Sequence, residues 1–310
     1  MMEMLREKTE RRIQMMGIIK NKESKRIAAS MGLLFAAFVW GFAFVVVKTS
    51  LDIIPPIYML AFRFTIASVA LCIIFHKKLK NITRKTIFMG FVLGFFLFTC
   101  YVVQTIGCKY TTAGKNAFLT TIYVILVPFL HWLISRKKLN KYNLMAAILA
   151  LVGIGLLSLQ GDLSINIGDG LTLLCGLLFS FQIIYIDKYT ETEDPILLTI
   201  LQIIVAAIFS WVLAPIMDAS ITNIPFNSQA VVSMLYLGIF STMIAFLIQN
   251  VCQKFTHPAT ASILLSMESV FGVLCSVIFL GEVLTIKMIF GCMIMFGAII
   301  LSQTKGSEGT

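Results

Sequence analysis

The sequence predicts an all-α integral membrane protein with ten transmembrane helices, arranged as two inverted five-helix repeats. Of the 310 residues, 58% are hydrophobic and only 13% are charged, whereas a soluble domain carries roughly 25% charged residues. The apolar residues form ten runs, and a membrane-spanning helix needs roughly 20 such residues. Two stretches of the chain also align at a constant offset. So much apolar surface excludes a soluble globular protein.

The first five predicted spans are separated by polar, basic or turn-forming residues. A cationic stretch, 1–27, precedes the first span, and the later ones end near basic residues or glycine. Pro128 lies inside the fourth span, where it removes a backbone hydrogen bond, so we expect a kink there. The spans are 28–48, 57–75, 87–107, 113–134 and 143–159.

The second five spans begin and end at proline, glycine and acidic residues. Pro195 and Pro258 lie in the first turn of the seventh and ninth spans, where a helix tolerates proline because the missing N–H has no partner there. Gly281-Glu282 separates the last two spans. The spans are 170–187, 196–216, 230–250, 259–280 and 284–303.

Positive charge predicts which ends of the spans face the cytoplasm. With the N-terminus inside, 20 Lys and Arg residues fall on the cytoplasmic side and four on the outer side. The sequence therefore predicts a multi-pass protein of the cell membrane, with residues 1–27 and 304–310 as cytoplasmic tails. Loops 77–85 and 136–141 would also be cytoplasmic. The net charge of +10 is then a topological signal, and we expect no nucleic-acid partner.

An internal repeat relates the two halves of the chain. Residues 111–139 and 256–284 align without a gap at an offset of 145 residues. The halves would be 28–159 and 170–303, with five spans each. Because five is odd, the two halves must lie in the membrane with opposite orientation. Inverted repeats of this kind generally place a substrate site near the midplane, where the halves meet.

Several short pieces of sequence follow one another in an informative order. They are Phe38-Val39-Trp40-Gly41-Phe42-Ala43-Phe44 with Lys48, Phe62-Arg63-Phe64 after Pro55-Pro56, residues 104–128 with Tyr110-Thr111-Thr112-Ala113-Gly114, Ser241-Thr242, Met267-Glu268-Ser269-Val270 and Gly281-Glu282. Together they resemble EamA-type transporters of the drug/metabolite transporter (DMT) superfamily. The resemblance covers residues from about 30 to 303. It implies a ten-helix secondary transporter that moves small metabolites, amino acids or drugs, often outward.

The sequence departs from the family pattern at two places. Glu268 is followed by Ser269 where the family often has Glu-Pro, so a kink in the ninth span is less assured. Arg136-Lys137 stands where many first repeats end in Gly-Glu. Neither departure affects the expected fold, but both weaken the transfer of mechanism residue by residue.

Two charged residues inside predicted spans are the main site candidates. Glu268 is the only acid well inside a span, and an ionisable group at that depth usually faces a cavity or a partner. It would suit proton coupling or a cationic substrate group, or else form a structural hydrogen bond. Arg63 would bind a carboxylate, pair with Glu268, or extend to the outer headgroups. The repeat places Tyr123 opposite Glu268.

Further candidates are polar or aromatic residues inside the spans. Asn116, Thr120 and Tyr123 recur at helical spacing, so this polar stripe lines a cavity or bonds to a neighbouring helix. Trp40 either stacks on a planar substrate or packs with its N–H bonded to a carbonyl. Lys115 is a cavity residue or reaches the outer surface. Gln104 is a weaker candidate, together with Gln182 and Gln249.

Motifs for other functions are not found. The sequence contains no metal-binding or nucleophile motif and no phosphate-binding loop, and Gly90-x-x-x-Gly94 is expected only to pack helices closely. The seven cysteines are scattered through apolar runs. We therefore expect no cofactor and no catalysis, and a small-molecule substrate and the lipid bilayer as partners. A channel, a lipid-handling protein or an unrecognised intramembrane enzyme remain alternatives, and monomer and homodimer are both open.

Overall fold

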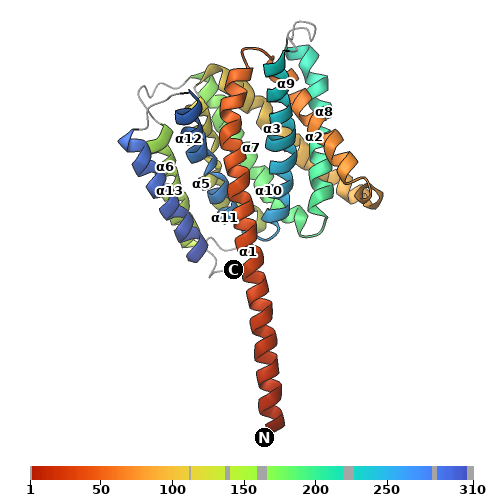
Figure 1. Cartoon of the computed structure of the whole chain (residues 1–310), viewed down its shortest axis with the longest axis vertical. Coiled ribbons are helices and arrows are strands. Elements are labelled where there is room, and N and C mark those ends of the chain that lie inside the picture. The colour runs from red at the N-terminus through yellow and green to blue at the C-terminus, as the bar shows by residue number, and fades with distance from the viewer. Residues whose placement is uncertain are drawn as a thin grey trace.

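The computed structural model describes residues 2–111, 113–136, 140–158, 166–218, 227–280 and 285–305. Every regular element in these ranges is helical, and the helices form one bundle (Figure 1). Helix α1 (Met2–Ser50) is the longest. Its C-terminal part runs through the bundle, and its N-terminal part projects well beyond it (Figure 1). The predicted all-α class is thus confirmed for the described residues.

Helices also coincide with the other predicted spans of the first half. The elements after α1 are α2 (Pro56–Ile74), the short 3₁₀ helix η1 (Lys78–Asn81), α3 (Arg84–Tyr110), α4 (Ala113–Thr120), α5 (Tyr123–Ser135) and α6 (Lys141–Ser158). The fourth predicted span is therefore divided between two helices, α4 and α5.

The second half shows the same correspondence, with one irregular and one divided span. Its elements are α7 (Ile167–Thr190), α8 (Pro195–Met217), α9 (Ser228–Leu235), the π-helical segment η3 (Tyr236–Ile244), α10 (Ala245–Gln253), α11 (Pro258–Leu265), α12 (Glu268–Leu280) and α13 (Ile286–Thr304). The eighth span is a continuous helix with a π-helical centre, and the ninth is divided into α11 and α12.

Most of these helices have the length and composition of membrane spans. In the described ranges, seven helical stretches are long and apolar enough to cross a membrane: 23–50, 56–74, 84–110, 167–190, 195–217, 228–253 and 258–279. Three shorter apolar stretches, 123–134, 141–156 and 289–302, overlap the fourth, fifth and tenth predicted spans. The chain is therefore built as a multi-pass membrane protein.

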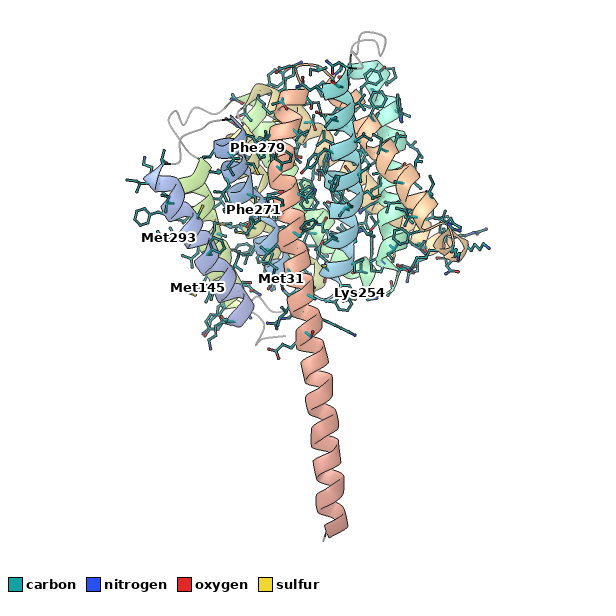
Figure 2. All side chains as sticks on the ribbon, viewed as in Figure 1. Met31, Met145, Lys254, Phe271, Phe279 and Met293 are labelled. Atoms are coloured by element: carbon teal, nitrogen blue, oxygen red, sulfur yellow. The ribbon has the colours of Figure 1, made fainter. Side chains whose placement is uncertain are left out.

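The outside of the bundle is apolar, as contact with lipid requires. Met31, Met145, Met293 and Phe279 are each more than half exposed and lie on the outside of the bundle (Figure 2). Lys254 lies at the end of the bundle from which the N-terminal part of α1 projects (Figure 2).

Local sequence signals determine where several helices begin. Thr83 and Asn166 form capping boxes at the starts of α3 and α7, and each box satisfies N–H groups that have no partner inside the helix. Asp194 accepts a hydrogen bond from the N–H of Ile196 at the start of α8. The expected placement of Pro195 and Pro258 in first turns is confirmed.

Two glycines bring α3 and α8 into close contact. A Cβ atom at Gly90 would lie 2.4 Å from Cβ of Leu201, and one at Gly94 would lie 2.7 Å from the carbonyl oxygen of Gln202. Any side chain at these positions would push the helices apart. The predicted close-packing role of Gly90-x-x-x-Gly94 is therefore confirmed.

The divided spans break at equivalent positions. The break between α4 and α5 falls at Thr121-Ile122, and the break between α11 and α12 falls at Ser266-Met267, 145 residues later. Both turns are held by short-range hydrogen bonds, such as Val124 N–H to the carbonyl of Thr121 at 3.0 Å. Helix α5 itself runs from Tyr123 through Pro128, so the discontinuity of this span precedes the proline at which a kink was expected.

Candidate functional site

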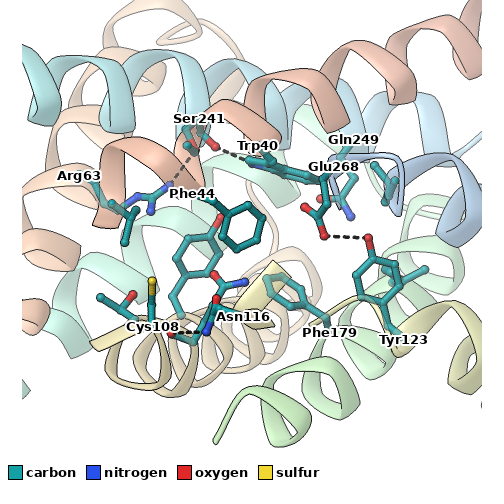
Figure 3. A pocket seen from close by; sticks show the side chains of 17 residues that line it. Trp40, Phe44, Arg63, Cys108, Asn116, Tyr123, Phe179, Ser241, Gln249 and Glu268 are labelled. Atoms are coloured by element: carbon teal, nitrogen blue, oxygen red, sulfur yellow. Dashed lines mark hydrogen bonds between the residues drawn. The ribbon is translucent and has the colours of Figure 1, made fainter. Parts of the chain in front are cut away.

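A cavity lies inside the bundle between the two halves of the chain (Figure 3). Its volume is about 50 Å³, and one water molecule needs only about 10–15 Å³ by the same measure. The lining residues come from α1 to α5 in the first half and from α7, η3, α10, α11 and α12 in the second. On α1, α2 and α3 they lie toward the ends at Ser50, Pro56 and Tyr110. Gln249 on α10 also lines the cavity.

The structure gathers most of the residues predicted from the sequence around this cavity. Seven of the ten candidates line it: Trp40, Arg63, Gln104, Asn116, Tyr123, Gln249 and Glu268. Thr120 is buried beside it and accepts a hydrogen bond from Nε2 of Gln104 at 3.2 Å. The side chain of Lys115 lies outside the described residues.

Arg63 is buried among neutral groups. Its side chain is 2% exposed, so it lies inside the bundle instead of extending to lipid headgroups. Its Nε donates to Oγ1 of Thr242 at 2.9 Å, and its Nη2 donates to Oγ of Ser241 at 3.0 Å. The guanidinium carbon lies 4.6 Å from the centroid of the Tyr101 ring, a cation–π distance.

The ion pair between Arg63 and Glu268, one alternative considered from the sequence, is not formed. In the described part of the chain, ion pairs join other residues. Instead, the guanidinium donates to the hydroxyl groups of Ser241 and Thr242, and Glu268 accepts a hydrogen bond from Tyr123. Among the described residues, the cation therefore has hydrogen-bond partners but no counter-charge.

The π-helical segment η3 supplies these hydroxyl groups. Two consecutive residues, Ser241 and Thr242, both accept hydrogen bonds from Arg63. The hydroxyl of Thr242 donates to the carbonyl of Leu237, five residues earlier, at 2.7 Å. Its oxygen lone pairs therefore stay available to accept the hydrogen bond from Arg63. π-Helical turns occur frequently at functional sites, and here the turn positions two hydroxyl groups that accept hydrogen bonds from a buried arginine.

Trp40 forms one wall of the cavity and is fixed by a hydrogen bond. Its Nε1 donates to the backbone carbonyl of Ser241 at 2.8 Å, and its ring lies 5.0 Å from the ring of Phe246. The N–H is therefore bonded to a carbonyl, as the packing alternative required. The indole still lines the cavity, so a substrate would meet an immobilised aromatic surface.

Glu268 lies at the break between α11 and α12, as the first residue of α12. It is 6% exposed and accepts a hydrogen bond from the hydroxyl of Tyr123 at 3.0 Å. The two residues are 145 positions apart, the offset of the sequence repeat. The predicted placement of Tyr123 opposite Glu268 is therefore confirmed, and the two helix breaks meet at the cavity wall.

The polar stripe on α4 faces both the cavity and the neighbouring helices. Nδ2 of Asn116 donates to Oγ1 of Thr172 at 2.8 Å and to the carbonyl of Gln104 at 3.2 Å. Oδ1 of Asn116 has no hydrogen-bond partner among the described residues, and neither does Oε1 of Gln249. Both residues are at most 2% exposed and line the cavity. Two acceptor oxygens are thus left for a bound molecule.

Sequence reasoning missed two aromatic residues of the site. Tyr101 and Phe179 line the cavity, and their rings lie 5.8 Å apart. Each is one of many aromatic residues in apolar spans, so nothing in the sequence singled it out. Figure 3 shows Phe44 and Phe179 between Arg63 and Glu268, with Tyr123 on the far side of the Glu268 carboxyl group.

The described part of the chain offers no metal centre. No group of three or more His, Cys, Asp or Glu residues within it is arranged to hold a metal ion. The chemistry of the site is therefore that of one guanidinium, one carboxyl group, several neutral hydrogen-bond donors and acceptors, and aromatic rings.

Comparison with known families gives a match over nearly the whole chain. The EamA-like transporter family matches residues 27–159 and, separately, residues 166–304. The two matched ranges meet between α6 and α7, which is where the sequence repeat divides the chain.

Comparison with curated proteins and solved structures agrees with this match. An uncharacterized transporter of Archaeoglobus fulgidus is 35% identical over 281 residues, covering 91% of this chain and 87% of its own length. The uncharacterized transporter YvbV of Bacillus subtilis is 22% identical, covering 92% and 94%. A solved crystal structure superposes with a TM-score of 0.75 at 15% identity, covering 91% of this chain and 97% of its own. That likeness shows the fold alone.

Proposed function

The chain belongs to the EamA-like transporter family and is thus a membrane transporter, and we propose that it is a secondary transporter that exports small metabolites, amino acids or drugs by alternating access. We also propose that it spans the cell membrane ten times with both termini in the cytoplasm. In this orientation 20 Lys and Arg residues lie on the cytoplasmic side and four on the outer side, and this excess of positive charge inside supports it. The seven long and three shorter apolar helical stretches support the number of spans.

We propose that residues 28–159 and 170–303 form two inverted repeats with the transport site between them. Two observations support the proposal. The helix breaks at Thr121-Ile122 and Ser266-Met267 are separated by the offset of the sequence repeat. The broken helices also meet at the cavity, and discontinuous helices commonly form the substrate site of secondary transporters.

The charged and polar groups that line the cavity indicate the chemical class of the substrate. Arg63 is a buried cation without a counter-charge among the described residues, and an uncompensated buried charge is costly. A substrate carboxylate is the group that best compensates it. The unpartnered oxygens of Asn116 and Gln249 and the carboxyl group of Glu268 accept hydrogen bonds from an ammonium group. We therefore propose a small zwitterion of the amino-acid type whose side chain contacts the aromatic walls.

Glu268 is the proposed coupling residue. It lies at a helix break, inside the membrane and against the cavity, where a carboxyl group can exchange a proton with the substrate path. Tyr123 orients the carboxyl group through its hydroxyl. In this scheme the bundle changes the side to which the cavity opens, and protonation of Glu268 accompanies that change.

Untargeted metabolite profiling of cells that overproduce the protein would test the transport proposal. We expect one class of zwitterionic metabolite to decrease inside the cells and increase in the medium. Arg63→Gln, which removes the cation but keeps hydrogen-bonding capacity, should abolish that change at equal protein abundance. Identical profiles for the wild type and for cells without the protein would contradict the proposal.

Glu268→Gln tests the coupling role separately. The amide keeps the size and hydrogen bonding of the carboxyl group but cannot ionise, so transport should lose its dependence on pH while the protein still inserts. Glu268→Leu serves as the structural comparison, since it also removes the bond to Tyr123 and should lower stability. Wild-type transport by Glu268→Gln at every pH would overturn the coupling role and leave the transporter assignment intact.

A further inference from the structure

Five buried amide side chains lie where α7, α8 and α10 meet; one of them lines the cavity, and the other four do not. They are Gln182 on α7, Gln202 on α8, and Gln249, Asn250 and Gln253 on α10, and each is at most 2% exposed. In the described part of the chain, each has one side-chain atom without a hydrogen-bond partner: an oxygen at Gln182, Gln249, Asn250 and Gln253, and the nitrogen at Gln202. We call these five residues the amide cluster.

Three of these amides donate hydrogen bonds between the three helices, two of them long. Gln182 donates to the amide oxygen of Gln202 at 3.4 Å, and Gln253 donates to the carbonyl of Ile183 at 3.4 Å. Asn250 donates to Oγ1 of Thr199 at 2.9 Å. Exchanging the oxygen and nitrogen of both Gln182 and Gln202 still leaves one bond and two unpartnered atoms. For this pair, the missing partners therefore do not depend on how the amides are assigned.

The amide cluster costs stability in the arrangement described. A buried amide atom without a partner costs about 1–3 kcal/mol, whereas leucine or methionine would pack the same helix interface without that penalty. Interfaces between membrane helices need small residues and satisfied polar groups. Five incompletely bonded amides in one interface therefore indicate polar ligands that this arrangement of the helices does not admit.

The position of the amide cluster shows where such ligands would come from. Gln249 lines the cavity, and Gln253 follows one helical turn later as the last residue of α10. Helix α10 ends, and α8 begins, at the end of the bundle where Lys254 lies. The amides thus extend from the cavity to that end, which is the cytoplasmic end in the proposed orientation, and none of them carries a charge.

We propose that the amide cluster is the cytoplasmic half of the transport path, where its free amide atoms bind water and the polar groups of a passing substrate. This inference rests on the proposed function, because it assigns the route by which molecules reach the cavity when the bundle opens inward. Neutral amides offer both donors and acceptors, so they conduct a hydrated zwitterion without holding either of its charges. Charge recognition stays with Arg63 and Glu268 in the cavity.

Sided cysteine labelling tests the proposal without a known substrate. Gln202→Cys would be treated with a membrane-impermeant methanethiosulfonate reagent in inside-out and right-side-out vesicles, and modification read at that residue by mass spectrometry. We expect labelling several-fold faster in inside-out vesicles. Ser210→Cys, equally buried on α8, is the matched control and should stay unlabelled. Native Cys100, which is also fully buried, reports on unfolding.

A double variant, Gln182→Leu with Gln202→Leu, tests the same proposal through stability and transport. Replacing both partners by apolar groups should leave the melting temperature unchanged or raise it, yet slow the release of the metabolite that profiling identifies. Absence of labelling at Gln202→Cys in both vesicle types, or wild-type release by the double variant, would overturn the inference. A wild type that releases no metabolite would instead contradict the proposed function, whatever the labelling shows.

Discussion

Gly41 is the position where a single methyl group should disturb the cavity wall most directly. A Cβ atom there would lie 2.7 Å from the backbone nitrogen of Gly272 and 2.8 Å from the carbonyl oxygen of Glu268. Ordinary contacts are 3.4–4 Å, so α1 and α12 would have to separate by several tenths of an ångström. Because these are backbone atoms that cannot rotate away, we expect Gly41→Ala to cost about 1–3 kcal/mol, as overpacking does.

Gly297 on α13 provides the matched control for this substitution. A Cβ atom at Gly297 would meet no described atom within 4 Å, and replacing glycine by alanine inside a helix stabilises it by roughly 0.5–1 kcal/mol. Thermal unfolding in one detergent should therefore rank Gly297→Ala at or above the wild type and Gly41→Ala below it. A melting temperature for Gly41→Ala equal to that of Gly297→Ala would refute the close approach of α1 and α12.

The remaining predictions concern orientation and the ion pair at the end of the bundle that carries Lys254. Lys80→Cys should react with an impermeant thiol reagent only in inside-out vesicles, and Lys287→Cys only in intact cells; the reverse pattern would overturn the proposed orientation. Asp194 is partly buried, which raises its pKa, but hydrogen bonds from Lys78 and from the N–H of Ile196 outweigh burial, so the pKa lies below its usual value. The pair therefore stabilises the fold fully near neutral pH, and its contribution disappears as the pH falls below about 4. The loss of melting temperature in Lys78→Met should be constant near neutral pH and shrink in acid, and a loss that grows in acid would show that the pair is not the cause.

The sequence was sufficient to predict two kinds of feature: those that follow from the pattern of apolar residues, and those that follow from the free-energy cost of placing a charged group inside a membrane. Apolar runs located the helices because a backbone in lipid must satisfy its own hydrogen bonds. The high cost of an acid at membrane depth singled out Glu268, and the repeat offset paired it with Tyr123 before any contact was known. The hydrogen bond between these two side chains is thus a three-dimensional contact derived from sequence spacing.

Other features of the site depend on helix geometry that composition does not encode. Nothing in the residues 236–244 marks them as π-helical, yet this segment supplies the partners of Arg63. For the same reason the sequence did not decide whether Arg63 pairs with Glu268. The break at Thr121-Ile122 was missed because Pro128 is the conspicuous residue of that span, although the helix tolerates it.

Saturable flux in proteoliposomes tests the central claim most directly. The purified protein would be reconstituted, and the uptake of the metabolite identified by profiling would be measured over a range of concentrations. If the cavity between Arg63 and Glu268 is a transport site that changes the side to which it opens, the rate will reach a plateau for the wild type. Reconstituted Arg63→Gln will show only the leak of protein-free liposomes. A wild-type flux that rises linearly at every concentration, or an unchanged flux with Arg63→Gln, would contradict the account.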